Sequence, residues 1–233
     1  MNKEEFINEL TKINVVLTEE QITKLEKYYQ LLKSWNEKIN LTRIILEHDV
    51  YLKHFYDSLT IIKGIKLNNQ NLCDMGTGAG FPGIVLKICF PNLKVTLLES
   101  INKKCLFLNE VIKELNLKDI VVVNERIEDY GRKNREKFDI VTARALATLN
   151  TLFEYSAPLL KVEGYFIAMK ADIDCEIKET SNALKELYLS VENIVSFELP
   201  FNGGKRNLVI VKKDRPTLLK YPRKFSEIKR KSL

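Results

Sequence analysis

Apolar residues follow two patterns along this chain, and the two patterns alternate from about residue 65 onwards. Short apolar runs rich in valine, isoleucine and leucine are typical of buried strands, and longer stretches with apolar residues at helical spacing are typical of amphipathic helices. The predicted strands are Asn71–Met75, Lys94–Glu99, Ile120–Asn124, Phe138–Ala143, Gly164–Lys170, Tyr188–Phe197 and Arg206–Lys212. The predicted helices between them are Gly83–Phe90, Asn102–Asn116, Leu149–Leu160 and Ile173–Leu187.

This alternation predicts an α/β fold, in which a doubly wound, mostly parallel sheet carries helices on both faces. The last two strands are an exception, because a turn-rich loop, Leu199–Lys205, joins them without a helix. We therefore expect these two strands to form an antiparallel hairpin at the edge of the sheet.

The chain begins with three predicted helices. Apolar residues from Phe6 to Ile13 share one helical face, and Thr18-Glu-Glu-Gln21 is a capping-box pattern that starts a second helix. That helix should end near Asn40, and a third is expected over about Glu47–Lys63. Amphipathic helices cannot bury their apolar stripes alone, so we expect them to pack on the α/β segment that comes after them in the chain.

The pattern of predicted elements divides the chain into three segments: an N-terminal helical extension (1–64), an α/β core (65–214) and a C-terminal tail (215–233). The tail and the end of the last strand are strongly basic. From Lys212 to Leu233 there are nine lysines and arginines against two acidic residues, in a chain whose net charge is +6. All the excess positive charge therefore lies at the C-terminus, where it indicates either a polyanion contact or a solvated end.

The remaining composition narrows the class of protein. A hydrophobic content of 45% and a charged content of 29% are ordinary for a globular protein, and no apolar run is long enough for a membrane span. The four cysteines lack a C-x-x-C spacing and are interpreted as reduced thiols, which favours the cytoplasm. With only two histidines, no metal site is predicted, and we interpret His54 as a packed or capping side chain. We expect a monomer.

One glycine-rich stretch carries most of the functional signal. Asp74-Met-Gly-Thr-Gly-Ala-Gly-Phe-Pro-Gly83 follows a predicted strand and precedes a predicted helix. Gly76, Gly78 and Gly80 allow a tight turn and a close approach of a ligand to the backbone. Such a turn presents N–H groups and the positive end of a helix to a polar ligand, which predicts a nucleotide-like cofactor.

Two cofactor classes fit this stretch. Gly78-x-Gly80-x-x-Gly83 matches the dinucleotide fingerprint, and Asp74-x-Gly76-x-Gly78-x-Gly80 matches the pattern of S-adenosylmethionine methyltransferases. Glu99, 21 residues after Gly78, supplies the acidic strand end that both classes use for ribose hydroxyls, so it does not separate them. Asp74 favours the methyltransferase, because a carboxylate in the turn disfavours a pyrophosphate. The expected antiparallel edge hairpin favours it too.

Other candidate residues lie where further strands end, because ligands of such sheets bind at the carboxyl ends of the strands. Phe81 follows the glycine turn, and Ile127 and Glu128 follow the third strand, where they could flank and hydrogen-bond an adenine. Arg144 directly follows the apolar strand that contains Ile140 to Ala143. Its position predicts a functional role, either in holding the cofactor or in orienting the substrate.

Together these segments resemble the bacterial 16S ribosomal RNA small-subunit methyltransferase G family, also called glucose-inhibited division protein B. The segments that carry the resemblance are Trp35–Thr42, His54–Leu59, Asp74–Gly83, Arg126–Glu128, Thr142–Ala145 and Tyr221–Lys224. The resemblance implies methylation of N7 of one guanine in a loop of 16S ribosomal RNA of the small subunit, with S-adenosyl-L-methionine as the cofactor.

By position, the residues that match the family's cofactor contacts are Gly76, Phe81, Ile127, Glu128 and Arg144. The chain departs from the family after Lys224, where Phe225-Ser-Glu-Ile228 replaces a stretch that usually contains glycine and proline.

The residues fit N7 chemistry independently of the resemblance. The chain has neither an N-P-P-Y-type motif, typical of exocyclic amine methylation, nor the Pro-Cys nucleophile typical of cytosine C5 methylation. Guanine N7 has a free lone pair and loses no proton on methylation, so no base is needed and no catalytic residue is predicted. The main task is alignment of the reacting atoms, which can lower a barrier by roughly 7–11 kcal/mol.

RNA contacts are predicted from charge and placement. The candidates for phosphate contacts are Lys170, Lys205, Arg206, Arg223 and Lys224. Two alternative functions remain open at this point. One is a nicotinamide-dependent oxidoreductase, and the other is a non-enzymatic RNA-binding protein with a vestigial cofactor site.

Overall fold

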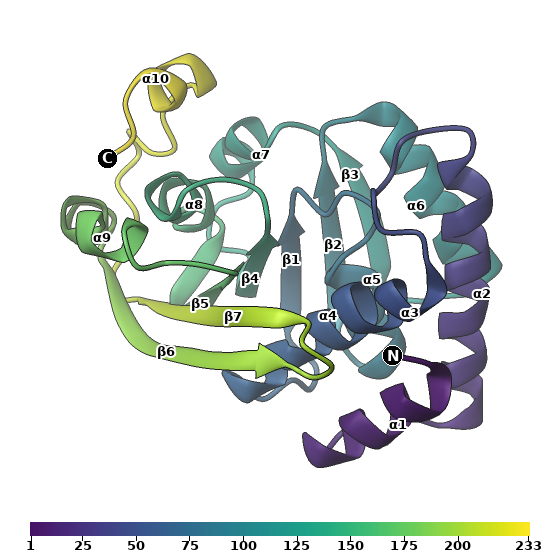
Figure 1. Ribbon diagram of the computed structural model, residues 1–233. Helices are drawn as coiled ribbons and strands as arrows, with labels where there is room; N and C mark the ends of the chain where they lie inside the picture. Colours follow the sequence, from purple (N-terminus) through teal and green to yellow (C-terminus); the bar gives the residue numbers. More distant parts are fainter.

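The computed structural model describes residues 1–233 and contains one seven-stranded sheet (Figure 1). Its strands lie in the order β3-β2-β1-β4-β5-β7-β6. The strands are β1 (Asn71–Met75), β2 (Lys94–Glu99), β3 (Ile120–Asn124), β4 (Phe138–Arg144), β5 (Leu160–Lys170), β6 (Leu189–Leu199) and β7 (Gly204–Lys213). The predicted α/β fold with a mostly parallel sheet is confirmed.

The first five strands are parallel, and β7 inserts antiparallel between β5 and β6. The predicted hairpin of the last two strands is therefore present, with β6 on the outside. An all-parallel dinucleotide-binding sheet has no such inserted strand. Because β1, β2, β3 and β4 are parallel, their carboxyl ends meet at one edge, and antiparallel β7 brings its first residues to that same edge.

Helices cover both faces of the sheet, which explains why the central strands are apolar on both sides. One face carries α2 (Glu19–Asn36), α5 (Gly83–Cys89) and α6 (Asn102–Glu114), and the other carries α7 (Ile127–Lys133), α8 (Leu149–Ser156) and α9 (Ser181–Leu187) (Figure 1). Each face has its own buried apolar cluster. No helix in the structure has both the length and the apolar character needed to cross a membrane.

The N-terminal helices are part of the larger cluster. Helix α1 (Lys3–Lys12) buries Phe6 and Leu10, and α2 buries Tyr28 and Leu32 in the cluster that also contains residues of β1, β2, α5 and α6. The capping box predicted at Thr18 is present: Gln21 N donates to Thr18 Oγ1, and Thr18 N donates to Gln21 Oε1. The extension and the core thus share one hydrophobic interior.

The third predicted helix is not one regular helix. It consists of α3 (Glu47–Val50), a π-helical turn η1 (Tyr51–Tyr56), α4 (Asp57–Leu59) and a 3₁₀ turn η2 (Thr60–Lys63). The wider π turn changes the side-chain phase, and the segment directs His54 and Asp57 as well as apolar residues into the protein, where both are buried. A simple 3.6-residue period could not predict that mixture.

Other boundaries also differ from the prediction. Helix α8 ends at Ser156 rather than Leu160, because Pro158 has no backbone N–H to continue the helical hydrogen bonds, and Leu160 begins β5. The predicted helix Ile173–Leu187 is a 3₁₀ turn, η3 (Glu176–Glu179), followed by α9. Two short helices, α7 and α10 (Phe225–Arg230), were not predicted from the sequence.

The C-terminal tail crosses the face that carries α7, α8 and α9, and two side chains hold it there. Arg135 donates to the carbonyl oxygens of Thr217 (2.5 Å) and Tyr221 (2.7 Å). Arg223 donates from its backbone N and from its guanidinium to Glu154, whose side chain is fully buried. These contacts place α10 beyond the carboxyl ends of the strands.

The Arg223–Glu154 contact generates a stability prediction. Replacing Arg223 by Gln leaves a fully buried carboxylate without its cation, and we expect the free energy of unfolding to fall by about 3 kcal/mol. Lys224→Gln is the matched control, because the neighbouring Lys224 side chain is exposed and makes no ion pair. The control should change stability by less than about 0.5 kcal/mol. Guanidinium-induced unfolding checks both values, and equal effects of the two substitutions would contradict the anchoring role.

Candidate functional site

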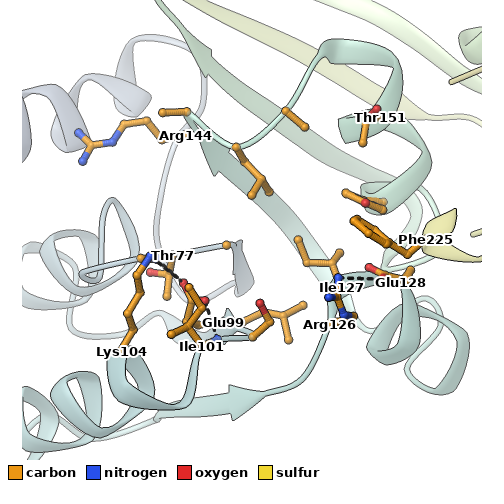
Figure 2. Close-up of a pocket in the computed structure, with 18 of the residues that line it drawn as sticks. Thr77, Glu99, Ile101, Lys104, Arg126, Ile127, Glu128, Arg144, Thr151 and Phe225 are labelled. Carbon is orange, nitrogen blue, oxygen red and sulfur yellow. Dashed lines mark hydrogen bonds and ion pairs between the residues drawn. The ribbon is translucent and has the colours of Figure 1, made fainter. Parts of the chain in front are cut away.

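A cavity of about 990 Å³ lies at the carboxyl ends of β1, β2, β3 and β4. Its walls contain the glycine-rich turn, Glu99, Ile127, Glu128 and Arg144, so one cavity unites most of the residues predicted for the cofactor. Glu99 and Glu128 lie on opposite sides of it, as Figure 2 shows. A volume of this size is in the range of small-molecule and cofactor sites.

Hydrogen bonds to Asp74 fix the glycine-rich turn from the side that faces away from the cavity. Asp74 is fully buried at the end of β1, and its Oδ2 accepts hydrogen bonds from Thr77 Oγ1 (2.6 Å) and from the backbone N of Gly83 (2.8 Å). Burial raises the pKa of Asp74 to about 6, against the effect of these two hydrogen bonds. Asp74 is absent from the cavity wall, so in this structure it shapes the turn instead of facing a ligand.

The glycines of the turn have different tasks. Gly76 and Gly78 line the cavity with φ angles of 63° and 62°, a region that disfavours other residues. A Cβ at Gly78 would project into open space, so a ligand can reach the backbone there. Gly80 lies away from the cavity, where a Cβ would collide with Tyr28 and Ile84. Its small size lets the hydroxyl of Tyr28 from α2 reach the carbonyl oxygen of Ala79.

Glu99 ends β2 and organises the rim beside the turn. Its Oε2 accepts from Gly78 N (3.1 Å) and its Oε1 accepts from Ile101 N (2.9 Å). Lys104 Nζ lies 3.9 Å from the same carboxylate. A carboxylate offers about four lone-pair sites, so Glu99 can still accept hydrogen bonds from two hydroxyl groups of a ligand.

Glu128 is the strongest sign that this cavity binds a polar ligand. It is 4% exposed in the first turn of α7, and its Oε1 is buried without a hydrogen-bond partner. Arg126 Nη1 lies 3.8 Å away, too far for a hydrogen bond (Figure 2). A buried carboxylate without a donor is costly, and Glu128 lines the cavity, so a ligand N–H or O–H at this carboxylate is favoured.

Arg144 ends β4, but its side chain turns away from Glu99 (Figure 2). Its Nη1 donates to Asp57 Oδ2 and to the carbonyl oxygen of Lys53, both at 3.0 Å, and its Nη2 lies 3.1 Å from His54 Nδ1. The guanidinium also lies 5.3 Å from the centre of the Phe81 ring. The structure thus joins Arg144 to the N-terminal extension.

A second cavity, of about 480 Å³, adjoins the first and shares His54, Arg144 and Ala145 with it. Its wall contains Lys170 and Arg206, two of the residues predicted for RNA. Both have a carboxylate partner within the chain. Lys170 pairs with Glu176 at 2.8 Å, and Arg206 pairs with Asp57 at 2.9 Å.

The other residues predicted for RNA lie apart from these. Lys205 is exposed at the start of β7, and Lys224 is exposed just before α10; neither makes an ion pair. Arg223 is occupied by the buried Glu154.

Part of the cavity wall was not predicted from the sequence. These residues of the wall are Thr42, His54, Lys104, Leu146, Tyr155, Phe225 and Ile228. Thr42 and His54 come from the extension, and Phe225 and Ile228 come from α10 at the departure from the family pattern. That departure was the one signal for α10 in the sequence. No local pattern indicated that residues 42 and 54 meet the glycine-rich turn.

The donor and acceptor groups fit the implied cofactor, S-adenosylmethionine. The free accepting capacity of Glu99 suits a ribose diol, and the Glu128 carboxylate, to which no protein group donates, suits the amino group of an adenine.

His54 provides a pH prediction. Burial, and then the nearby Arg144, lower the pKa of His54 to about 3, whereas an unfolded chain protonates histidine near pH 6.5. The stability that neutral His54 contributes is therefore complete above pH 6.5 and is lost as the pH falls towards 3. Asp74 acts in the opposite sense, because its raised pKa restores stability on acidification from about pH 6 to 4.

Because the two effects offset each other, the individual titration is the sharper measurement. We expect the imidazole NMR signals of His54 to stay constant between pH 8 and about 4.5. The exposed His48, the only other histidine, gives the reference signals in the same spectrum. A His54 titration midpoint above about 5 would contradict the burial argument.

Comparisons with known proteins agree with this geometry. The family model described as rRNA small subunit methyltransferase G matches residues 21–209. The ribosomal RNA small subunit methyltransferase G of Desulforamulus reducens is 51% identical over 212 residues, which cover 89% of this chain and 88% of that protein. The protein of the same name from Bacillus subtilis is 43% identical over 228 residues, covering 96% and 95%.

Solved structures support the fold at much lower identity. M. jannaschii TYW2 in complex with AdoMet superposes with a TM-score of 0.53 at 16% identity, over 67% of this chain and 74% of that one. A 16S rRNA (adenine(1408)-N(1))-methyltransferase from Catenulisporales acidiphilia gives a TM-score of 0.53 at 12% identity, over 64% and 87%. The family match over most of the chain is decisive: this protein belongs to the rRNA small subunit methyltransferase G family.

Proposed function

We propose that the protein transfers a methyl group from S-adenosylmethionine to N7 of a guanine in 16S ribosomal RNA of the small subunit. The observation that carries the proposal is the cavity itself, in which the glycine-rich turn, Glu99 and the unpaired Glu128 form the walls in a chain of this family. A ribosomal substrate also agrees with the cytoplasmic location expected from the cysteines.

The cofactor would lie across the carboxyl ends of β1, β2 and β3. In this proposal Gly76 and Gly78 allow close approach to the backbone, Glu99 accepts from the ribose hydroxyls, and Ile127 and Glu128 contact the adenine. Asp74 and Gly80 support the turn from behind, through Thr77 and Tyr28 respectively. Phe81 of the turn stacks on His54 of the N-terminal extension, with ring centres 4.2 Å apart, so the turn packs against the extension.

The bound cofactor supplies an activated methyl group on a sulfonium, so the protein's own residues need only align and exclude water. Guanine N7 loses no proton, so no base is required, and Nδ1 of the neutral His54 is occupied by its contact with Arg144. Leu146, two residues after the end of β4, packs close to Gly76 and narrows the cavity beside the turn. Residues of the extension, β4 and β7 then border the side from which RNA would enter.

RNA phosphates would bind the lysines and arginines around the side of the cavity from which RNA would enter. Lys205 and Lys224 are the freest of the predicted contacts, since both are exposed and without an ion pair. Lys229, Arg230 and Lys231 of the tail also line the cavity rim. Lys170, Arg206 and Arg223 would have to share their donors with a carboxylate, so we propose a supporting role for them. Phosphate contacts of this kind position RNA and carry little sequence information.

The decisive experiment is methyl transfer from labelled S-adenosylmethionine to small ribosomal subunits that lack the modification. We expect label on one guanine of 16S ribosomal RNA, as N7-methylguanine identified by mass after nuclease digestion. Large ribosomal subunits are the matched control and should remain unlabelled. Label on another atom or base would replace the N7 proposal, and cofactor binding without any transfer would support the vestigial alternative.

Glu128 allows a separate test of the cofactor pose. Glu128→Ala removes a carboxylate that no protein donor satisfies, so stability should stay equal or rise, while affinity for S-adenosylmethionine should fall about tenfold, or about 1.4 kcal/mol. The control is Asp129→Asn, the next residue on α7, whose side chain is about half exposed and pairs with Arg132. Calorimetric titration and thermal unfolding measure the two quantities. Unchanged affinity in Glu128→Ala would place the adenine elsewhere.

A further inference from the structure

One carboxylate of the N-terminal extension joins two arginines that come from distant parts of the core. Asp57, at the start of α4, is 4% exposed. Its Oδ2 accepts from Arg144 Nη1 at 3.0 Å, and its Oδ1 accepts from Arg206 Nε at 2.9 Å. Arg144 ends β4, whereas Arg206 lies near the start of β7, so the two guanidinium groups meet only through Asp57.

The neighbours of Asp57 limit the movement of both arginines. The Lys53 carbonyl oxygen and His54 Nδ1 also face Arg144, and the Phe81 ring lies beside its guanidinium. On the other side, Arg206 Nη1 donates to the carbonyl oxygen of Lys205 at 2.8 Å. Each arginine is therefore held at several points, and Asp57 is the only group that contacts both.

Donor groups remain free after these contacts. Arg206 Nη2 and Arg144 Nε have no hydrogen-bond partner in the protein, and the Arg144 and Arg206 side chains are 14% and 20% exposed. Both side chains line the second cavity, which adjoins the cofactor cavity at His54, Arg144 and Ala145. Guanidinium donors at such a junction match the phosphate oxygens and the base oxygen of a nucleotide.

Stability alone does not account for this arrangement. Burying a carboxylate with two guanidinium groups carries a desolvation cost that often cancels the attraction between the charges. An apolar side chain on α4 would pack with less cost, as the neighbouring Leu59 does. What the charged arrangement provides is a fixed distance and direction for two cations that belong to different strands.

We propose that Asp57 is a positioning residue for methyl transfer: it holds Arg144 and Arg206 so that their free donors grip the target nucleotide of the RNA beside the cofactor cavity. The inference rests on the proposed function and deepens it, because it assigns Arg144 to the RNA and not to the cofactor. It also makes the N-terminal extension part of the active site, since Asp57 and His54 both act from there.

The test compares Asp57→Asn with the wild-type protein. Asparagine keeps the size of the side chain but loses the charge and one of the two acceptors, so each arginine is held less firmly. We expect kcat/KM for the small subunit to fall about 30-fold, because a displacement of ~1 Å in a positioning group can cost about 100-fold. Affinity for the subunit, measured without methyl donor, should fall about fivefold. Affinity for S-adenosylmethionine should stay within about twofold.

The matched control is Asp49→Asn, which removes another aspartate of the same segment. Asp49 pairs with the side chain of Lys53 at 2.8 Å and is absent from both cavity walls. It should behave as wild type in all three measurements. If Asp57→Asn lowers the melting temperature by more than about 5 °C, Asp57→Glu replaces it, because glutamate keeps the charge but shifts the carboxylate by one methylene relative to both guanidinium groups.

Two results would overturn the inference. One is a loss of kcat/KM and of subunit affinity no larger than that of Asp49→Asn. The other is a parallel loss of affinity for S-adenosylmethionine, which would assign Asp57 to the cofactor site. Wild-type protein without methyl transfer would overturn the proposed function instead, and the subunit affinities would still decide whether Asp57 positions the arginines.

Discussion

The buried Asp74 carboxylate, through its hydrogen bonds to Thr77 and to the backbone of Gly83, is the interaction on which the site depends. These two bonds close the turn between β1 and α5, so that Gly76 and Gly78 adopt left-handed angles facing the cavity. The closed turn also places Gly78 N against Glu99, which links β1 to β2. Hydrogen bonds from Asp74 and Glu99 thus fix the geometry of the turn, and Asp74 does so from a buried position that does not face the cavity.

The N-terminal extension also packs against the glycine-rich turn. Tyr28 of α2 packs on the turn and bonds to Ala79, and the His54 ring stacks on Phe81. Because Asp57 of the same segment pairs with Arg144 and Arg206, the extension contacts the glycine-rich turn, β4 and β7 together. A segment that sequence patterns describe only as amphipathic helix therefore provides polar groups at the junction of the two cavities.

In the C-terminal tail, two neighbouring basic residues that the charge pattern treats alike have different roles in the structure. Arg223 and Lys224 were predicted together as phosphate contacts, because both are basic and adjacent. Glu154 distinguishes them. It is fully buried under the tail and forms an ion pair with the guanidinium of Arg223, whereas Lys224 stays exposed. That anchor brings Phe225 and Ile228 of α10 to the cavity wall.

By itself the sequence determined the strand positions, the edge hairpin and the glycine-rich turn with Glu99 and Glu128, since each is a local pattern that the backbone obeys directly. The end of α8 follows from the missing backbone N–H of Pro158, a local cause. The geometry within residues 47–63 was decided by tertiary packing, because several local geometries suit the same residues. Asp57, His54, Arg144 and Arg206 are distant in sequence. They come into contact only because the fold packs the extension against β4 and β7, and no spacing along the chain predicts these contacts.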